Sequence, residues 1–200
     1  MNHKVPPQIK GAESDAVSNI EFETVALAEK HFETVKKRFL DINSWELFAG
    51  KEKAEFSLRN SNGDVIVESP NVGDLVAIKI PLLPNQDPDH LDWAKVEVVE
   101  EDKSDISESV YIRLRPTSKP SDKDASVTHF LYSDSTSNFI IKREGKMISA
   151  QVHARNEVPN TEDKGISEKL RNKMVAFGAM MIGSTIQWKG LTNGLIKIEE

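Results

Sequence analysis

The side chains best suited to chemistry lie between residues 127 and 143 of this 200-residue chain. His129 could act as a general acid or base, because the unperturbed pKa of histidine lies near neutrality. Tyr132 and Arg143 could polarise a carbonyl oxygen. Alternation along a strand would place His129 and Tyr132 on opposite faces, and either face could point inward. His129, Tyr132 and Arg143 are therefore weak catalytic candidates, and the alternative for His129 is a hydrogen-bonded or solvent-facing strand histidine.

A second group of polar side chains follows at the end of the last expected strand. His153 and Arg155 stand on that strand, and Glu157 begins the loop that leads toward a helix. A loop at this place could form the rim of a pocket, with His153, Arg155 and Glu157 at its mouth. The alternative for Arg155 and Glu157 is an ion pair that only fixes the loop.

The residues that several common kinds of catalytic or metal site require are missing from the sequence. The chain has no cysteine, which excludes disulfides, thiolate metal sites and a cysteine nucleophile. Its five histidines are scattered without metal-ligand spacing, so we expect no metal. Neither a phosphate-binding glycine loop nor a Gly-x-Ser-x-Gly turn occurs, and we expect no cofactor.

Composition describes one domain outside the membrane. The 26 basic and 32 acidic side chains give a net charge of −6, which argues against a nucleic-acid partner. The uncharged stretch 174–188 is shorter than the 18 or so residues that a membrane span needs. Residues 1–18 lack a signal-like apolar segment and predict a flexible arm, so residues 19–200 form the domain and a cytoplasmic location is expected.

The acidity is concentrated between residues 84 and 108, where nine acids accompany two lysines. A solvated surface is one interpretation, and a surface for a protein partner is the other. A calcium loop is not supported, because the spaced aspartates with a closing glutamate are missing.

Hydrophobic periodicity indicates which elements hold these side chains. Alternation at residues 20–24 predicts a strand, and steps of three and four from Ala28 to Phe39 predict an amphipathic helix, followed by a brief helix at 43–50. A period of two from 53 to 154 predicts six or seven antiparallel strands, with a hairpin turn at Asn62–Gly63. The helical period returns after residue 161 and continues to Leu195, although four glycines in this helix weaken it.

The order of these elements resembles the START-like, or SRPBCC, superfamily. The resemblance is carried by residues 39–48 (FLDINSWELF), 72–76 (VGDLV) and 188–191 (WKGL), and residues 137–160 resemble Bacteroidetes-type members. It implies the α+β helix-grip fold of the birch-pollen allergen and the polyketide cyclases, in which a curved antiparallel sheet wraps around a long C-terminal helix.

The resemblance also implies a cavity between sheet and helix for a lipid-like or other hydrophobic molecule. The residues expected to line it are Met174, Phe177, Met181, Trp188, Ile112 and Val96. The same stripe could instead fill the cavity as core. We therefore expect a non-catalytic binding protein for a small hydrophobic ligand. The alternatives are a cyclase, dehydratase or hydrolase that uses the same cavity, and a protein-interaction module.

Overall fold

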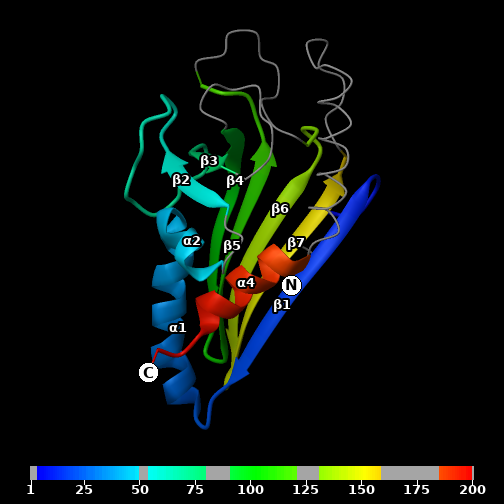
Figure 1. Cartoon of the computed structure of the whole chain (residues 1–200). Helices are drawn as coiled ribbons and strands as arrows, with labels where there is room; N and C mark the ends of the chain where they lie inside the picture. The colour runs from blue at the N-terminus through cyan, green and yellow to red at the C-terminus, as the bar shows by residue number, and fades with distance from the viewer. Residues whose placement is uncertain (1–3, 50–53, 80–90, 121–130, 159–184, 200) are drawn as a thin grey trace.

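The computed structural model describes residues 4–49, 54–79, 91–120, 131–158 and 185–199. It is an α+β structure in which seven antiparallel strands form one curved sheet (Figure 1). The elements are β1 (Ala12–Glu21), α1 (Val25–Leu40), the 3-10 turn η1 (Ile42–Ser44), α2 (Trp45–Phe48), β2 (Glu55–Arg59), β3 (Leu75–Lys79), β4 (Asp92–Lys103), β5 (Ser107–Pro116), β6 (Thr136–Glu144), β7 (Met147–Glu157) and α4 (Thr185–Ile196). This arrangement is consistent with a helix-grip fold.

The strands are ordered β1-β7-β6-β5-β4-β3-β2 across the sheet. From β2 to β7, chain neighbours are also sheet neighbours, whereas β1 pairs with β7, so that Ala16 lies opposite Val152. The strand β1 begins at Ala12 and not near Ile20 as the alternation predicts. Residues 12–18, expected in a flexible arm, therefore belong to the sheet.

The two faces of the sheet differ in what covers them. Side chains of the inner face, such as Phe139 and Val152, pack against α1, α2 and α4 in the main core. The outer face carries polar side chains, among them Tyr111 and Asn138. This alternation is the pattern that predicted an antiparallel sheet, and that prediction is confirmed.

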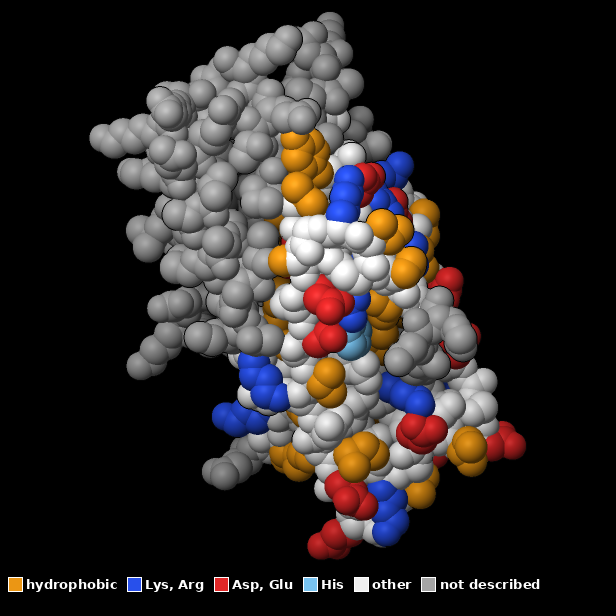
Figure 2. All heavy atoms as spheres, turned by 90° about the vertical axis from the view of Figure 1, so that its right-hand side faces the viewer, with side chains coloured by type: hydrophobic (Ala, Val, Ile, Leu, Met, Phe, Trp, Pro, Cys, Tyr) orange, Lys and Arg blue, Asp and Glu red, His pale blue; other side chains and the backbone are white. Residues whose placement is uncertain are grey.

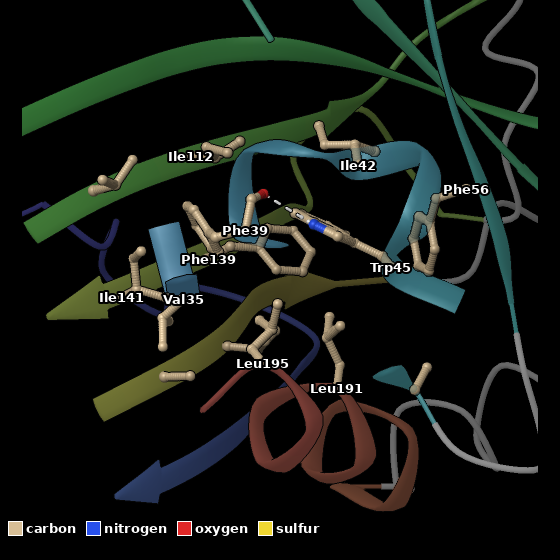
Figure 3. Close-up of a cluster of buried hydrophobic side chains, with 14 of the residues drawn as sticks. Val35, Phe39, Ile42, Trp45, Phe56, Ile112, Phe139, Ile141, Leu191 and Leu195 are labelled. Carbon is tan, nitrogen blue, oxygen red and sulfur yellow. Dashed lines mark hydrogen bonds between the residues drawn. The ribbon is translucent and has the colours of Figure 1, made fainter. Parts of the chain in front are cut away.

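Helix α1 is held by a cap and by its apolar stripe. The hydroxyl of Thr24 accepts a hydrogen bond from the backbone N–H of Leu27 at 3.2 Å, which satisfies one open donor of the first turn. The stripe predicted from the sequence is buried at Ala28, Phe32, Val35 and Phe39. After the helix ends, the chain turns so that the Trp45 indole N–H donates to the Phe39 carbonyl at 2.9 Å (Figure 3).

The turn at Asn62–Gly63 forms, but the expected second strand does not follow it. The side chain of Asn60 accepts hydrogen bonds from the backbone N–H groups of Asn62 and Asp64 and closes the turn. Only one bridge, from Arg59 to Val65, continues past it. Val67 is 91% exposed, whereas the true partner strand of β2 is β3.

Helix α4 lies against α2 at backbone distance. A Cβ atom built on Gly190 would lie 2.4 Å from the Ala49 carbonyl oxygen, and one on Gly194 would lie 2.3 Å from that of Phe48. Both distances are far below van der Waals contact. The two glycines, which weaken a helix by propensity, are therefore required by the packing of α4 on α2.

An N-terminal strap, residues 4–11, crosses the outer face. At one end the Lys4 ammonium contacts acidic side chains of β4. The backbone carbonyl of Lys4 accepts a hydrogen bond from the Tyr111 hydroxyl at 3.0 Å. At the other end the Asn156 side-chain oxygen accepts from the backbone N–H groups of Ile9 and Lys10 at 2.7 and 3.2 Å. The strap keeps Tyr111 buried, and this burial raises the pKa of its hydroxyl.

Asn156 also has a left-handed backbone, with φ of 57°, which asparagine tolerates better than most residues. We expect Asn156→Ala to cost about 2 kcal/mol, because it removes the strap hydrogen bonds and places an unsuited residue at that φ. Asn156→Gly should lower the stability less, because glycine adopts this φ without strain and only the hydrogen bonds to the strap are lost. Urea unfolding of the two variants measures the difference. Equal costs would contradict a backbone contribution.

The side of the molecule nearest β1 has mixed charge. Figure 2 shows acidic and basic side chains interspersed there, with apolar atoms scattered among them. In the described ranges, no helix combines the length and apolar character that crossing a bilayer requires.

Candidate functional site

The candidate site begins at an aromatic cluster on the inner face. The Trp45 ring lies 4.7 Å from that of Phe139 and 5.5 Å from that of Phe56, measured between centroids. Trp188 of α4 closes the cluster, with its ring edge-on to Phe139 at 5.5 Å and tilted against Phe56 at 6.5 Å. Trp45 is completely buried, whereas Trp188 is only partly buried and lies at the margin of the core.

Polar contacts with β1 help to fix α4 in this position. The hydroxyls of Ser18 on β1 and Thr192 on α4 are 2.7 Å apart and share a hydrogen bond, and both residues are buried. The Lys189 ammonium donates to the carbonyl of Val17 on the same strand. These contacts and the buried leucines of α4, shown in Figure 3, hold the helix against the sheet. They therefore also fix the position of Trp188 on that helix.

Beyond the aromatic cluster, the inner face of the sheet carries small side chains. Phe139 pairs with Val152, and the next inner-face pair along β6 and β7 is Ser137 with Ala154. On β1 the corresponding inner position is Ser14, which pairs with Ala154. The large rings therefore give way to small groups in the direction of the C-terminal end of β7.

A buried carboxyl group stands at that end. The register between β1 and β7 shifts between Ala12 and Ser14, which pair with Glu157 and Ala154 respectively. This β-bulge places Glu157 opposite Ala12, on the inner face. Glu157 is 8% exposed, and its Oε2 atom has no hydrogen-bond partner. Burial raises the pKa of Glu157 to about 7, against the smaller opposing effect of the Arg155 charge.

The other two rim candidates lie on the opposite face of the sheet. His153 bonds to Asp15 at 2.7 Å and to Gln151 at 3.1 Å, all on the outer face. Arg155 pairs with Asp15 at 2.7 Å and with Glu13 at 3.6 Å. The alternative interpretation of Arg155 and Glu157 as an ion pair is wrong, because the bulge between them turns the two side chains to opposite faces.

The two catalytic candidates within the described residues, Tyr132 and Arg143, are not brought together. Tyr132 precedes β6, and its backbone N–H donates to the Val158 carbonyl at 3.0 Å. Arg143 lies near the far end of β6, about 20 Å or more away at the rise of a strand. His129 lies outside the described residues. The structure therefore gives no support to Tyr132 and Arg143 acting on one substrate atom.

The ligand-binding candidates divide into two groups. Val96 and Ile112 are fully buried on the inner face within the main core, and Trp188 lies at the margin of that core. Met174, Phe177 and Met181 lie outside the described residues. Sequence reasoning did not select Phe56, Phe139 and Glu157 together as one site. Alternation could have found the two aromatic residues, whereas only the bulge reveals where Glu157 points.

Most of the described acidic segment is neutralised by cations. Glu97 pairs with Arg115, Glu100 and Asp102 with Lys4, and Glu101 with Lys36. Glu108 is held by Lys103 at 2.9 Å and Lys36 at 3.6 Å. Burial opposes ionisation of Glu108, but these two lysines hold its pKa below the usual value. Within the described ranges, no His, Asp and Glu side chains cluster as a metal site would.

Comparison with known proteins yields only distant structural likeness. No protein-family model matches the chain, and no curated protein matches it. A hypothetical protein of Helicobacter pylori is 10% identical with a TM-score of 0.44, covering 90% of this chain and 86% of its own. An Arthrobacter aurescens protein is 13% identical with a TM-score of 0.43, covering 94% and 90%. A major latex-like protein of Panax ginseng is 10% identical with a TM-score of 0.31, covering 86% and 96%.

Proposed function

We propose that this protein binds a small hydrophobic molecule between the inner face of the sheet and its C-terminal helix. The observation that carries the proposal is the partly buried Trp188, whose ring borders the core beside Phe139 and Phe56. An aromatic wall beside small side chains at Ser137 and Ala154 suits an apolar guest. The resemblance to the START-like superfamily points to the same place.

The packed part of the core limits where the ligand binds. Leu191 and Leu195 of α4 are fully buried between the helices and the sheet (Figure 3), and Ile112 on β5 is also fully buried. The proposed pocket therefore lies beyond Trp188, toward Glu157, and not beneath α4 itself. Val96 and Ile112 would not contact the ligand and would instead belong to the packed core next to the pocket.

Glu157 gives the pocket one polar group. With a pKa of about 7, roughly half of these carboxyls are protonated at neutral pH and can donate a hydrogen bond. We propose that the ligand carries a carbonyl or hydroxyl group near one end, which pairs with this buried carboxyl. A ligand with its own carboxylate there would be disfavoured once Glu157 is ionised.

Trp188 should report binding directly. We expect an uncharged apolar probe such as N-phenyl-1-naphthylamine to bind saturably and to quench tryptophan fluorescence, that of Trp188 included, by energy transfer. Trp188→Phe should lower the affinity for the probe about threefold or more, because the probe loses part of its aromatic wall. Native mass spectrometry of the purified protein, with organic extraction, would reveal a ligand that is already bound.

The matched control is Trp93→Phe. Trp93 is also buried, but it belongs to a separate cluster with Leu75 and Ala77 on the other side of the sheet. This variant should bind the probe as the unchanged protein does. The proposal is overturned if the two variants bind the probe with equal affinity, or if no apolar molecule binds and none is extracted.

A further inference from the structure

A buried arginine stands at the end of the inner face opposite Glu157. Arg143 follows Phe139 and Ile141 along the inward-facing positions of β6, and its side chain is 3% exposed. Its neighbours across the strands are Glu108 on β5 and Ile148 on β7. Burying a guanidinium is costly unless an anion and hydrogen bonds compensate it.

The groups around Arg143 do not supply that compensation. Its Nη1 atom lies 3.4 Å from the carbonyl oxygens of Ile106 and Gly145, at the limit of hydrogen bonding. Its Nη2 atom lies 3.7 Å from the Glu29 carboxylate, beyond hydrogen-bond distance, and Nε has no partner. Glu108 is engaged by Lys36 and Lys103 instead. The Nε atom is therefore buried without a hydrogen bond, and within the described residues Nη2 has only the 3.7 Å ion pair with Glu29.

Arg143 borders a hollow of about 580 Å³ between α1 and the turn that joins β4 to β5. Glu29 on its rim is half-exposed, so its carboxylate can swing into solvent without disturbing the core. Glu33 and Asp105 also line the hollow, and neither makes an ion pair within the described part of the chain. Two lysines, Lys30 and Lys103, also line the hollow.

We propose that this hollow is a binding site for a small monocarboxylate, which takes the place of Glu29 at Arg143. The two oxygens of a carboxylate match the Nε–Nη2 edge of a guanidinium and form two parallel charge-assisted hydrogen bonds. The acids on the rim set the charge of the guest. A single negative charge replaces that of Glu29 without net change, whereas the second charge of a dianion is repelled by Glu33 and Asp105, which make no ion pair within the described residues.

The test is an acetate titration of the full chain, followed by NMR on the Nε–H resonance of Arg143. Arg143→Lys identifies that resonance by its loss and keeps the positive charge. Chloride is exchanged for acetate at constant ionic strength. We expect a saturable shift in the unchanged protein. Acetate binding followed by its effect on the melting temperature should be about tenfold weaker in Arg143→Lys, since lysine lacks the planar fork.

Glu29→Gln and Glu33→Gln form the matched pair, because each removes one exposed acid from the same hollow. Glu29→Gln should tighten acetate binding about threefold more than Glu33→Gln does, because only Glu29 competes for Arg143. Equal effects of the two variants, or a non-saturating shift, would overturn the site. Inorganic phosphate binding at pH 8 as tightly as acetate would overturn the assignment to monocarboxylates.

Discussion

Gly194→Ala is expected to destabilise the protein by about 2 kcal/mol or more, although alanine is the better helix former by about 1 kcal/mol. The added methyl would lie 2.3 Å from the Phe48 carbonyl oxygen and 2.8 Å from the Phe48 Cβ atom. The steric cost exceeds the propensity gain because the oxygen belongs to the backbone of α2 and cannot rotate away. Urea unfolding followed by circular dichroism measures the change.

Two further variants separate this clash from other causes. Phe48→Ala combined with Gly194→Ala should not restore stability, since the carbonyl oxygen remains in place. Asn193→Ala, in the same turn of α4, adds no atom against α2 and should cost about 1 kcal/mol or less through its lost bond to Ser18. Unchanged stability of Gly194→Ala would mean that α4 does not contact α2 in this way.

Glu157→Gln is expected to stabilise the protein at pH 8 by about 3 kcal/mol and to have little effect at pH 5. The pKa of Glu157 is raised from 4.5 to about 7 by burial, so the folded state binds the proton more tightly than the unfolded chain does. The folded form of the unchanged protein is then favoured most below pH 4.5, and it loses that stability as the pH rises to about 7. Glutamine keeps the shape of the protonated acid and cannot ionise.

Thermal unfolding between pH 5 and pH 8 tests this expectation. The melting temperatures of the two proteins should diverge as the pH rises, by about 5 °C or more at pH 8. Glu13→Gln serves as the control, because Glu13 lies exposed on the outer face and pairs at 3.6 Å with Arg155. A pH-independent difference between Glu157→Gln and the unchanged protein would show that Glu157 is not a buried ionisable group.

Periodicity was sufficient to predict most of the sheet, α1 and the described part of the C-terminal helix, Thr185–Ile196. The part of that predicted helix before residue 185 lies outside the described residues. The steps from Ala28 to Phe39 place the buried stripe of α1 correctly, because a helix on a sheet has a fixed apolar spacing. The start of β1 was missed since its first residues are small and polar, with neither β-branched nor aromatic side chains until Val17. Val65 and Val67 led to the opposite error. They are β-branched residues in alternation, which predicts a strand, but they form no strand of the sheet and are exposed.

The candidate site was less predictable because its geometry depends on irregular backbone. His153, Arg155 and Glu157 alternate in sequence as one face, yet the bulge turns Glu157 to the other side. A bulge depends on how two strands distant in sequence pair, and alternation within one strand carries no sign of it. In the same way, Gly190 and Gly194 looked like weaknesses of the last helix until their contacts with α2 were seen.

The position of β1 beside β7 also affects how the chain folds during synthesis. Ala16 is made early, but its partner Val152 leaves the ribosome on the order of ten seconds later. Until then β1 lacks its sheet neighbour, and closing so long a loop slows the late folding step. Folding of the nascent chain should therefore be completed only after the last strand emerges.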